Sequence, residues 1–177
     1  MNVVDNFLDK SEYDALYNHI IGSTVTQQFP WYFNSKKIDD VNIDYNFQFV
    51  HIVVENGKID SPITFEVLKP LLNKLKPKGL IRIKLNLTTK TNKIIKYPLH
   101  RDINVKYEKD IGQLKKDNYK VAIFYMNDNN GYTYFENKKK VKSVANRLLK
   151  FDNIMKHSGT TCTDENQRVV ININYEV

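Results

Sequence analysis

The chain of 177 residues has little cysteine, glycine or proline and no long apolar run. Its single cysteine, Cys162, excludes an internal disulfide framework and any zinc site built from several cysteines. The longest apolar stretch, Val121 to Met126, falls far short of the roughly 20 residues that a membrane-spanning helix needs. The six glycines and five prolines are scattered and form no linker. We therefore predict one domain over residues 1–177 and no membrane span.

The first residues, Met1 to Asp5, also lack the features of a secretory signal peptide. They show neither a basic region nor an apolar stretch. Together with the single cysteine, this absence predicts a cytoplasmic protein in a reducing environment.

Arginine is scarce as well, which weakens the formal charge of +7 as an indication of nucleic-acid binding. Residues 69–120 hold 15 basic and 4 acidic residues, whereas residues 1–68 hold 4 basic and 10 acidic ones. However, only 4 of the 27 basic residues are arginine, and the abundance of lysine, asparagine and isoleucine is typical of an A/T-rich genome. Nucleic-acid binding through the basic block 69–120 stays open, but we favour a solvated surface.

Apolar residues at helical spacing predict two helices. The first runs over roughly Lys10 to Ile21, with Asp9 or Ser11 as its cap. The second runs over Ser61 to Leu75, and Pro70 within it predicts a kink.

The rest of the chain alternates between apolar and polar residues, which predicts short strands bounded by turn residues. These strands are Thr24–Phe33, Ile43–Glu55, Leu80–Thr88, Pro98–Val105, Tyr119–Met126, Tyr132–Phe135, Lys140–Val144, Arg147–Phe151 and Val169–Tyr175. Because no helix separates the strands after residue 78, we predict a jelly-roll or barrel rather than a βαβ sheet. The two helices would cover the outside of one sheet.

The four histidines divide into two ordinary ones and two candidate metal ligands. His19 lies inside the first predicted helix and His51 in an apolar strand, where structural roles suffice. On an extended chain, His100 and Asp102 point to the same side and present an imidazole and a carboxylate together. His157 follows on a different strand. Two histidines and one carboxylate are the ligand set of non-haem Fe(II), which keeps three further positions open.

The last predicted strand also has two distinct faces. One face carries Arg168, Val170, Asn172 and Asn174, and the other carries Val169, Ile171, Ile173 and Tyr175. The polar face lies either in solvent or in a pocket, and we favour the pocket, with the apolar face packed under the helices. There a guanidinium can hold a carboxylate through two parallel hydrogen bonds.

From about Leu80 onwards, these motifs resemble the Fe(II)- and 2-oxoglutarate-dependent dioxygenases of the prolyl-4-hydroxylase-like branch. The motifs are His100-x-Asp102, His157-Ser158-Gly159, Arg168, and the segment Gly131-Tyr132-Thr133-Tyr134-Phe135, which is similar to that family's Gly-x-Thr-x-Phe strand. The resemblance implies a mainly β fold with N-terminal helices (α+β), a double-stranded β-helix of the cupin-like jelly-roll type. It also implies that His100, Asp102 and His157 bind Fe(II). The co-substrate 2-oxoglutarate would chelate this iron, with its distal carboxylate paired to Arg168, and dioxygen would be consumed.

One position departs from the family pattern. Many relatives place a tyrosine two residues after an asparagine on the strand ahead of His-x-Asp, and both contact 2-oxoglutarate. Here Asn86 is present, but Thr88 occupies the tyrosine position. Asn86 is therefore a candidate co-substrate ligand, and the hydroxyl of Thr88, Tyr97 or Tyr125 is a candidate replacement, although Tyr125 also fits a core position.

The resemblance implies hydroxylation of a C–H bond, with oxidation of 2-oxoglutarate to succinate and carbon dioxide. The carboxylate of Asp102 argues against halogenation, because halogenating relatives lack it. A protein or peptide side chain, proline first, or a small molecule is the expected prime substrate. The alternatives are oxidative demethylation of alkylated nucleic acid and a non-catalytic jelly-roll binding module.

Substrate choice would come from the loops around the pocket, expected at Phe29 to Asp44 and Lys106 to Asn118. In the first of these loops, the aromatic residues Trp31–Phe33 line an entrance or belong to the core. The sequence does not separate these two interpretations.

Overall fold

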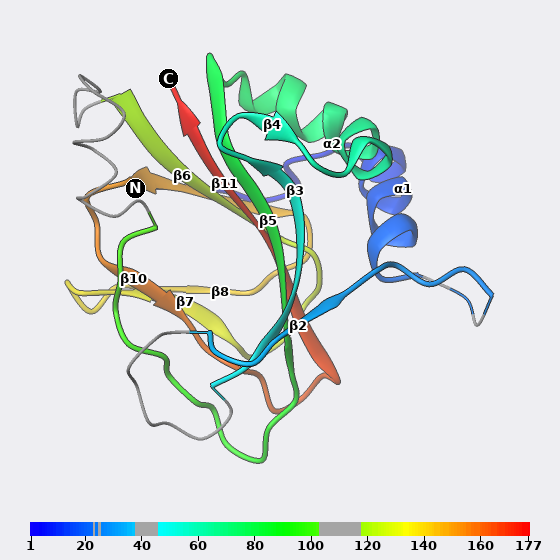
Figure 1. Ribbon diagram of the computed structural model, residues 1–177. Helices are drawn as coiled ribbons and strands as arrows, with labels where there is room; N and C mark the ends of the chain where they lie inside the picture. The colour runs from blue at the N-terminus through cyan, green and yellow to red at the C-terminus, as the bar shows by residue number, and fades with distance from the viewer. Residues whose placement is uncertain (23, 25, 38–45, 103–117) are drawn as a thin grey trace.

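In the computed structural model, residues 1–22, 24, 26–37, 46–102 and 118–177 are described (Figure 1). They form a large antiparallel sheet, a small antiparallel sheet and two helices. The large sheet has the strand order β1-β9-β6-β11-β5-β3-β2, with β4 paired to β3, and the small sheet has the order β10-β7-β8. Several neighbouring strands of the large sheet, such as β1 with β9 and β11 with β5, are far apart in sequence, as in a jelly-roll.

The large sheet contains β1 (Asn2–Val4), β2 (Tyr32–Asn34), β3 (Gln48–Glu55), β4 (Lys58–Ile59), β5 (Gly79–Thr89), β6 (Tyr119–Tyr125), β9 (Arg147–Asp152) and β11 (Gln167–Glu176). The small sheet contains β7 (Tyr132–Phe135), β8 (Lys140–Lys142) and β10 (His157–Gly159). The predictions for β5, β6, β7, β8, β9 and β11 are confirmed to within two residues at each end.

Both predicted helices are present, as α1 (Lys10–Ile20) and α2 (Pro62–Leu75). Asp9 is the N-cap of α1, and its backbone N–H donates to the Glu12 carboxylate at 3.1 Å, which satisfies one free donor of the first turn. Helix α2 continues through Pro70 to its end, so this proline does not terminate it. Among the described residues, neither helix is long and apolar enough to cross a membrane.

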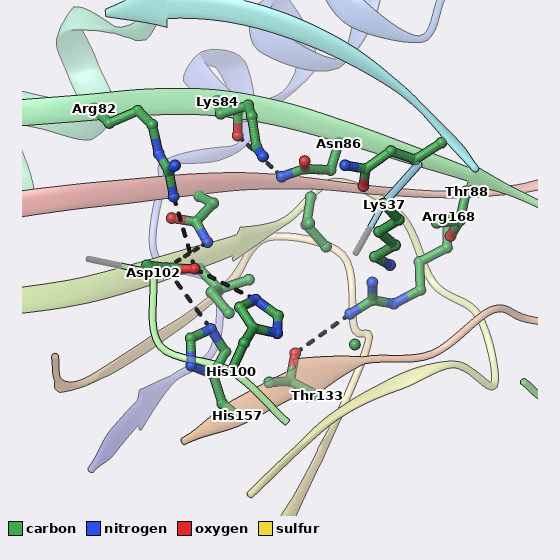
Figure 2. A pocket seen from close by; sticks show the side chains of 15 residues that line it. Lys37, Arg82, Lys84, Asn86, Thr88, His100, Asp102, Thr133, His157 and Arg168 are labelled. Carbon is green, nitrogen blue, oxygen red and sulfur yellow. Dashed lines mark hydrogen bonds and ion pairs between the residues drawn. The ribbon is translucent and has the colours of Figure 1, made fainter. Parts of the chain in front are cut away.

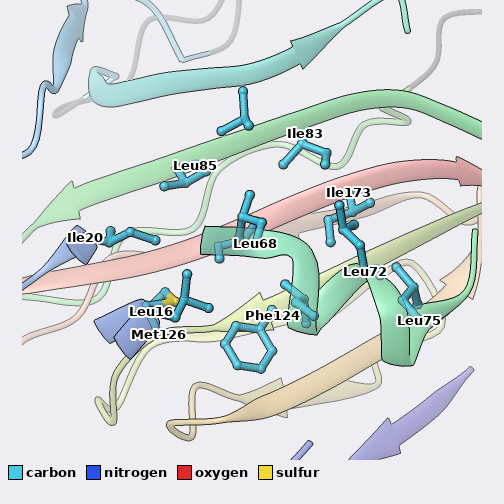
Figure 3. Packing of buried hydrophobic residues seen from close by; sticks show 14 of the residues in the cluster. Leu16, Ile20, Leu68, Leu72, Leu75, Ile83, Leu85, Phe124, Met126 and Ile173 are labelled. Atoms are coloured by element: carbon cyan, nitrogen blue, oxygen red, sulfur yellow. The ribbon is translucent and has the colours of Figure 1, made fainter. Parts of the chain in front are cut away.

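The helices cover the outer face of the large sheet, as predicted (Figure 1). Figure 3 shows Leu68, Leu72 and Leu75 of α2 packed over Ile83 of β5 and Ile173 of β11. Each fully buried side chain of this kind contributes about 1.5–3 kcal/mol relative to its exposed state. This burial fixes which face of β5 and β11 is apolar, and therefore which face is left for the site.

A second apolar cluster joins the inner faces of the two sheets. It combines Val121, Ile123 and Leu149 of the large sheet with Phe135 and Val141 of the small one. The two sheets therefore pack against each other, and polar side chains of β5 and β11 occupy the rest of the space between them.

Two strand predictions are wrong in the described part of the chain. Of Thr24–Phe33, only the last two residues belong to a strand, β2. Of Pro98–Val105, residues 98–102 form no strand, and a single antiparallel bridge joins His100 to His157. Strands β1 and β4, of three and two residues, are too short to show alternation and were not predicted, whereas β10 is the separate strand expected to carry His157.

Some predicted features lie outside the described residues. They are residues 43–45 at the start of the strand expected at Ile43–Glu55, residues 103–105 of the strand expected at Pro98–Val105, and most of the two expected substrate loops, residues 38–44 and 106–117.

Candidate metal centre and anion pocket

A polar pocket lies between the two sheets, on the face of β5 and β11 that the helices do not cover (Figure 2). Arg82, Lys84, Asn86 and Thr88 line it from β5, and Arg168, Val170 and Asn172 line it from β11. Its cavity of about 90 Å³ is several times what one water requires, so a small polar ligand fits. The predicted alternation of the last strand is confirmed, because its apolar face belongs to the core under the helices.

At one end of the pocket, His100, Asp102 and His157 come together (Figure 2). One potential ligand atom from each lies within 4.8 Å of the others. Asp102 Oδ1 is 3.6 Å from His100 Nε2, and Asp102 Oδ2 is 3.7 Å from His157 Nε2. Reciprocal backbone hydrogen bonds of 3.0 Å between His100 and His157 hold the two chain segments side by side. Three residues predicted from separate segments therefore form one cluster.

Both histidines present the same nitrogen to the centre of this cluster. The Nδ1 atom of His100 lies 3.2 Å from the Pro98 carbonyl, and that of His157 lies 3.3 Å from the Met155 carbonyl. Since a carbonyl can only accept, Nδ1 carries the proton in each ring and Nε2 presents its lone pair. Burial lowers the pKa of His157, which favours the neutral imidazole that a metal requires.

Two asparagines on β11 fix the Asp102 carboxylate. Asn172 Nδ2 and Asn174 Nδ2 donate to the same oxygen, Oδ2, at 2.9 and 3.0 Å. These bonds orient the carboxylate toward the two imidazoles. The sequence placed both asparagines on the Arg168 face but gave no hint of this role, because their partner is 70 and 72 residues away.

The carboxylate of Asp102 is ionised although its side chain is only 4% exposed. Burial by itself raises the pKa of this group. A hydrogen bond with the His100 imidazole, the electrostatic interaction with the His157 ring and the positive charge of Arg82 together outweigh burial and hold the Asp102 pKa well below its usual range. Two imidazoles and one ionised carboxylate fit Fe(II) as a ligand set and leave room for further ligands.

Arg168 lies at the other end of the pocket and is almost fully buried. Its Nε donates to Ser143 Oγ at 2.8 Å and its Nη2 to Thr133 Oγ1 at 3.3 Å, and the Tyr125 ring lies 5.7 Å from the guanidinium carbon. No carboxylate of the described residues lies within 4.0 Å of it. A buried guanidinium with neutral partners alone can accept a carboxylate from a ligand.

Two glycines make room for this arginine. A Cβ atom on Gly131 would lie 2.7 Å from Arg168 Cδ, and one on Gly159 would lie 3.2 Å from Arg168 Nη1. These residues belong to the predicted Gly-x-Thr-x-Phe and His-Ser-Gly segments, and Thr133 of the first segment bonds Arg168 directly. The motif glycines are therefore explained by close approach of the side chain that lies between them.

The candidate co-substrate ligands on β5 reach the same pocket. Asn86 lines it and donates from Nδ2 to the Lys84 carbonyl at 3.3 Å. Thr88 lines it too, and its hydroxyl is buried without a hydrogen-bond partner among the described residues. Tyr125 and Tyr97 are not among the residues that line the pocket: Tyr125 donates its hydroxyl hydrogen to Thr133 at 2.8 Å, and the buried ring of Tyr97 lies against Lys37 Nζ.

Three cations of the pocket were not predicted. Arg82 and Lys84 share the inner face of β5 with Asn86, so strand alternation could have identified them. Lys37 follows β2 and reaches the pocket from a segment without regular structure, for which the sequence gives no signal.

The other two histidines have structural partners on the opposite side of the large sheet. His51 contacts the Pro30 carbonyl and Ser61 Oγ, each at 2.9 Å, and His19 contacts Thr64 Oγ1 at 3.3 Å. Neither His51 nor His19 lines the polar pocket.

Comparison by sequence finds no match, either to a family model or to a curated protein. Comparison of structures finds a prolyl hydroxylase from Trichoplax adhaerens, solved in complex with a hypoxia inducible factor oxygen degradation domain peptide fragment. It has a TM-score of 0.59 and 14% identity over 99% of this chain and 82% of that one. An oxidoreductase of the 2OG-Fe(II) oxygenase family from Burkholderia pseudomallei has a TM-score of 0.56 and 10% identity over 94% and 78% of the two chains. The predicted double-stranded β-helix is thus confirmed, with the fold of these oxygenases.

Proposed function

We propose that this chain is an Fe(II)- and 2-oxoglutarate-dependent dioxygenase that hydroxylates a C–H bond and releases succinate and carbon dioxide. One observation carries the proposal. The same pocket holds a cluster of His100, Asp102 and His157 at one end and, at the other, the buried Arg168, which pairs with no carboxylate of the described residues. A ligand with an acid group at each end matches this arrangement, because one end can reach a metal while the other pairs with the guanidinium.

The residues of the chain have distinct tasks in this reaction. His100, Asp102 and His157 would hold Fe(II), which supplies the activation of dioxygen coupled to oxidation of the co-substrate. The protons on Nδ1 of both histidines keep Nε2 available, and the two asparagines keep the carboxylate ionised and oriented. Arg168 orients the co-substrate through its distal carboxylate, and the packed sheets exclude water from the oxidation.

The experiment that tests this function is the formation of succinate from 2-oxoglutarate by the purified protein with Fe(II). We expect His157→Ala and Asp102→Ala to reduce succinate to background, because each removes one of three protein ligands. His19→Ala, a histidine remote from the pocket, is the matched control and should retain activity. Equal activity in all variants would contradict the iron assignment.

A prolyl or other peptide side chain is the first prime substrate to test. The support is the structural likeness to a prolyl hydroxylase solved with a peptide. Mass spectrometry of peptide libraries after turnover should reveal a gain of one oxygen atom in a peptide that contains proline. A library without any oxidised peptide, under conditions that produce succinate, would argue for a small molecule.

Demethylation of alkylated nucleic acid is a second candidate. The observation that favours it is the presence of Arg82 and Lys84 in the pocket, within a basic block of the sequence. It predicts binding to single-stranded oligonucleotides that weakens steeply with salt. Binding that is absent or insensitive to salt would remove this candidate.

If the protein takes up no metal and Arg168→Ala leaves ligand-induced thermal shifts unchanged, a non-catalytic binding module replaces both enzymatic functions.

A further inference from the structure

The distal end of the pocket contains a second cation beside Arg168. The side chain of Lys37 reaches into the pocket, and Figure 2 shows its ammonium pointing toward the guanidinium. Its Nζ lies 3.6 Å from the centre of the Tyr97 ring, and its backbone N–H donates to the Asn46 carbonyl at 3.0 Å. The ring contact positions the ammonium and the backbone hydrogen bond positions the main chain of Lys37, which distinguishes it from an exposed lysine without contacts.

The two cations face each other, and within the described part of the chain no carboxylate pairs with either of them. No carboxylate of the described residues lies within 4.0 Å of Lys37 Nζ, and the carboxylate in the pocket lining, Asp102, contacts the histidines and Arg82 at the opposite end. Burial, together with the charges of Arg168 and Lys84, places the pKa of Lys37 well below its usual range. Two neighbouring, partly desolvated cations are costly unless an anion lies between them.

The chain also lacks the hydroxyl that relatives use at this point. Thr88 replaces the tyrosine, and its short side chain leaves its buried hydroxyl without a hydrogen-bond partner among the described residues. The Tyr125 hydroxyl donates to Thr133, so its hydrogen is not available to a ligand. An ammonium donates three hydrogen bonds and carries a full charge, so Lys37 can replace a tyrosine hydroxyl as a donor to a carboxylate.

We infer that Lys37 binds the distal carboxylate of 2-oxoglutarate together with Arg168, as a second counter-ion in place of the missing tyrosine. The inference rests on the proposed function, because it assigns a further residue to the same co-substrate. It predicts that discrimination in favour of a dicarboxylic 2-oxo acid depends on Lys37 as well as on Arg168.

Binding of two co-substrate analogues tests this role without turnover. The ligands are 2-oxoglutarate and 2-oxopentanoate, which has the same chain length but no distal carboxylate, and Mn(II) replaces Fe(II). Loss of a charge-assisted hydrogen bond should weaken 2-oxoglutarate binding to Lys37→Met by about 10- to 100-fold in calorimetry. Binding of 2-oxopentanoate should be unchanged. The matched control is Lys36→Met, which removes the neighbouring exposed lysine and should alter neither affinity.

Two further measurements separate binding from a structural role. In steady-state assays with Fe(II), Lys37→Met should raise KM for 2-oxoglutarate and largely preserve kcat at saturation, and Lys37→Arg should recover part of the lost affinity. The melting temperature of the ligand-free Lys37→Met protein should not fall, because the variant relieves repulsion from Arg168. A lower melting temperature with equal weakening of both ligands would assign Lys37 to folding and overturn the inference.

The outcomes also separate this inference from the proposed function. If the wild-type protein prefers 2-oxoglutarate over 2-oxopentanoate, and Arg168→Ala abolishes the preference while Lys37→Met retains it, the inference fails and the function stands. If the wild-type protein shows no preference between the two acids, the proposed co-substrate is wrong and both fail.

Discussion

The two asparagines that hold Asp102 offer a quantitative test of the metal centre. Asn174 is 1% exposed, and its Nδ2 donates to Asp102 Oδ2 at 3.0 Å, while Asn172 donates to the same oxygen at 2.9 Å. A hydrogen bond to a charged group contributes about 1.5–3 kcal/mol, which corresponds to about 10- to 150-fold in an equilibrium constant. Asn174→Ala should therefore weaken metal binding by about 10- to 100-fold, the range found when groups that support metal ligands are removed.

The effect acts through the carboxylate and not through the fold. Without the amide donor, the ionised form of Asp102 loses part of its stabilisation, so its pKa rises and its orientation is less fixed. Because the two asparagines share one acceptor, their contributions are coupled, and the double variant Asn172→Ala/Asn174→Ala should bind metal more weakly than either single variant.

Anaerobic titration calorimetry with Fe(II), repeated with Mn(II), measures this affinity directly. The matched control is Asn146→Gly, which removes a buried asparagine that bonds to the backbone of Leu8. The backbone of Asn146 has a φ of 58°, which glycine adopts without strain, so the control should lose some stability and retain its metal affinity. Wild-type metal affinity in the double asparagine variant would refute the assignment of Asp102 as a ligand oriented by β11.

Three further predictions concern the anion pocket, the dependence on pH and the core. Gly131→Ala would place a Cβ 2.7 Å from Arg168 Cδ, so the displaced guanidinium should raise KM for 2-oxoglutarate by about 10- to 100-fold in succinate assays. The unfolding free energy of the metal-free protein, from urea titrations, should fall as the pH drops below about 6.5 and again below about 4. In both windows the unfolded chain binds more protons than the native one, because the fold lowers the pKa values of His157 and His19 in the first window and of Asp102 and Asp5 in the second. Asp102→Asn should therefore reduce the second decrease. Leu71→Ala, at a fully buried position of α2, should cost about 2–5 kcal/mol in the same titrations and leave KM unchanged.

The sequence predicts best those features that are decided by local patterns. The strand over Val169–Tyr175 was identified with its two faces, because alternation along one strand places Arg168 in the pocket and Ile171 in the core whatever the neighbouring strands are. The prediction for residues 24–33 failed because a strand also needs a partner, and its first part has none among the described strands. Strand propensity is a weak guide without that knowledge.

A short sequence motif was enough to predict the residues of the candidate metal cluster, but not the residues that surround it. His100 and Asp102 were predicted to lie on a strand, yet one β-bridge between His100 and His157 is enough to bring both residues next to the third candidate ligand. The prediction that these residues lie together is therefore correct, although the strand predicted around them is not formed. Lys37 and Asn174 could not be assigned in the same way, because their roles depend on partners that only the tertiary fold brings near.

The distribution of charge in the pocket argues that it serves a ligand and not the stability of the fold. Arg168 and Lys37 lie at one end, where the described residues place no carboxylate, and Asp102 lies at the other end with a strongly lowered pKa. A fold selected for stability alone would pair these groups or replace them with apolar side chains, since unpaired buried charge is destabilising. Perturbed titratable groups held apart in a cleft are instead typical of functional sites. A metal beside Asp102 and an acid group between Arg168 and Lys37 would neutralise both ends at once, and a single 2-oxo diacid can bridge them.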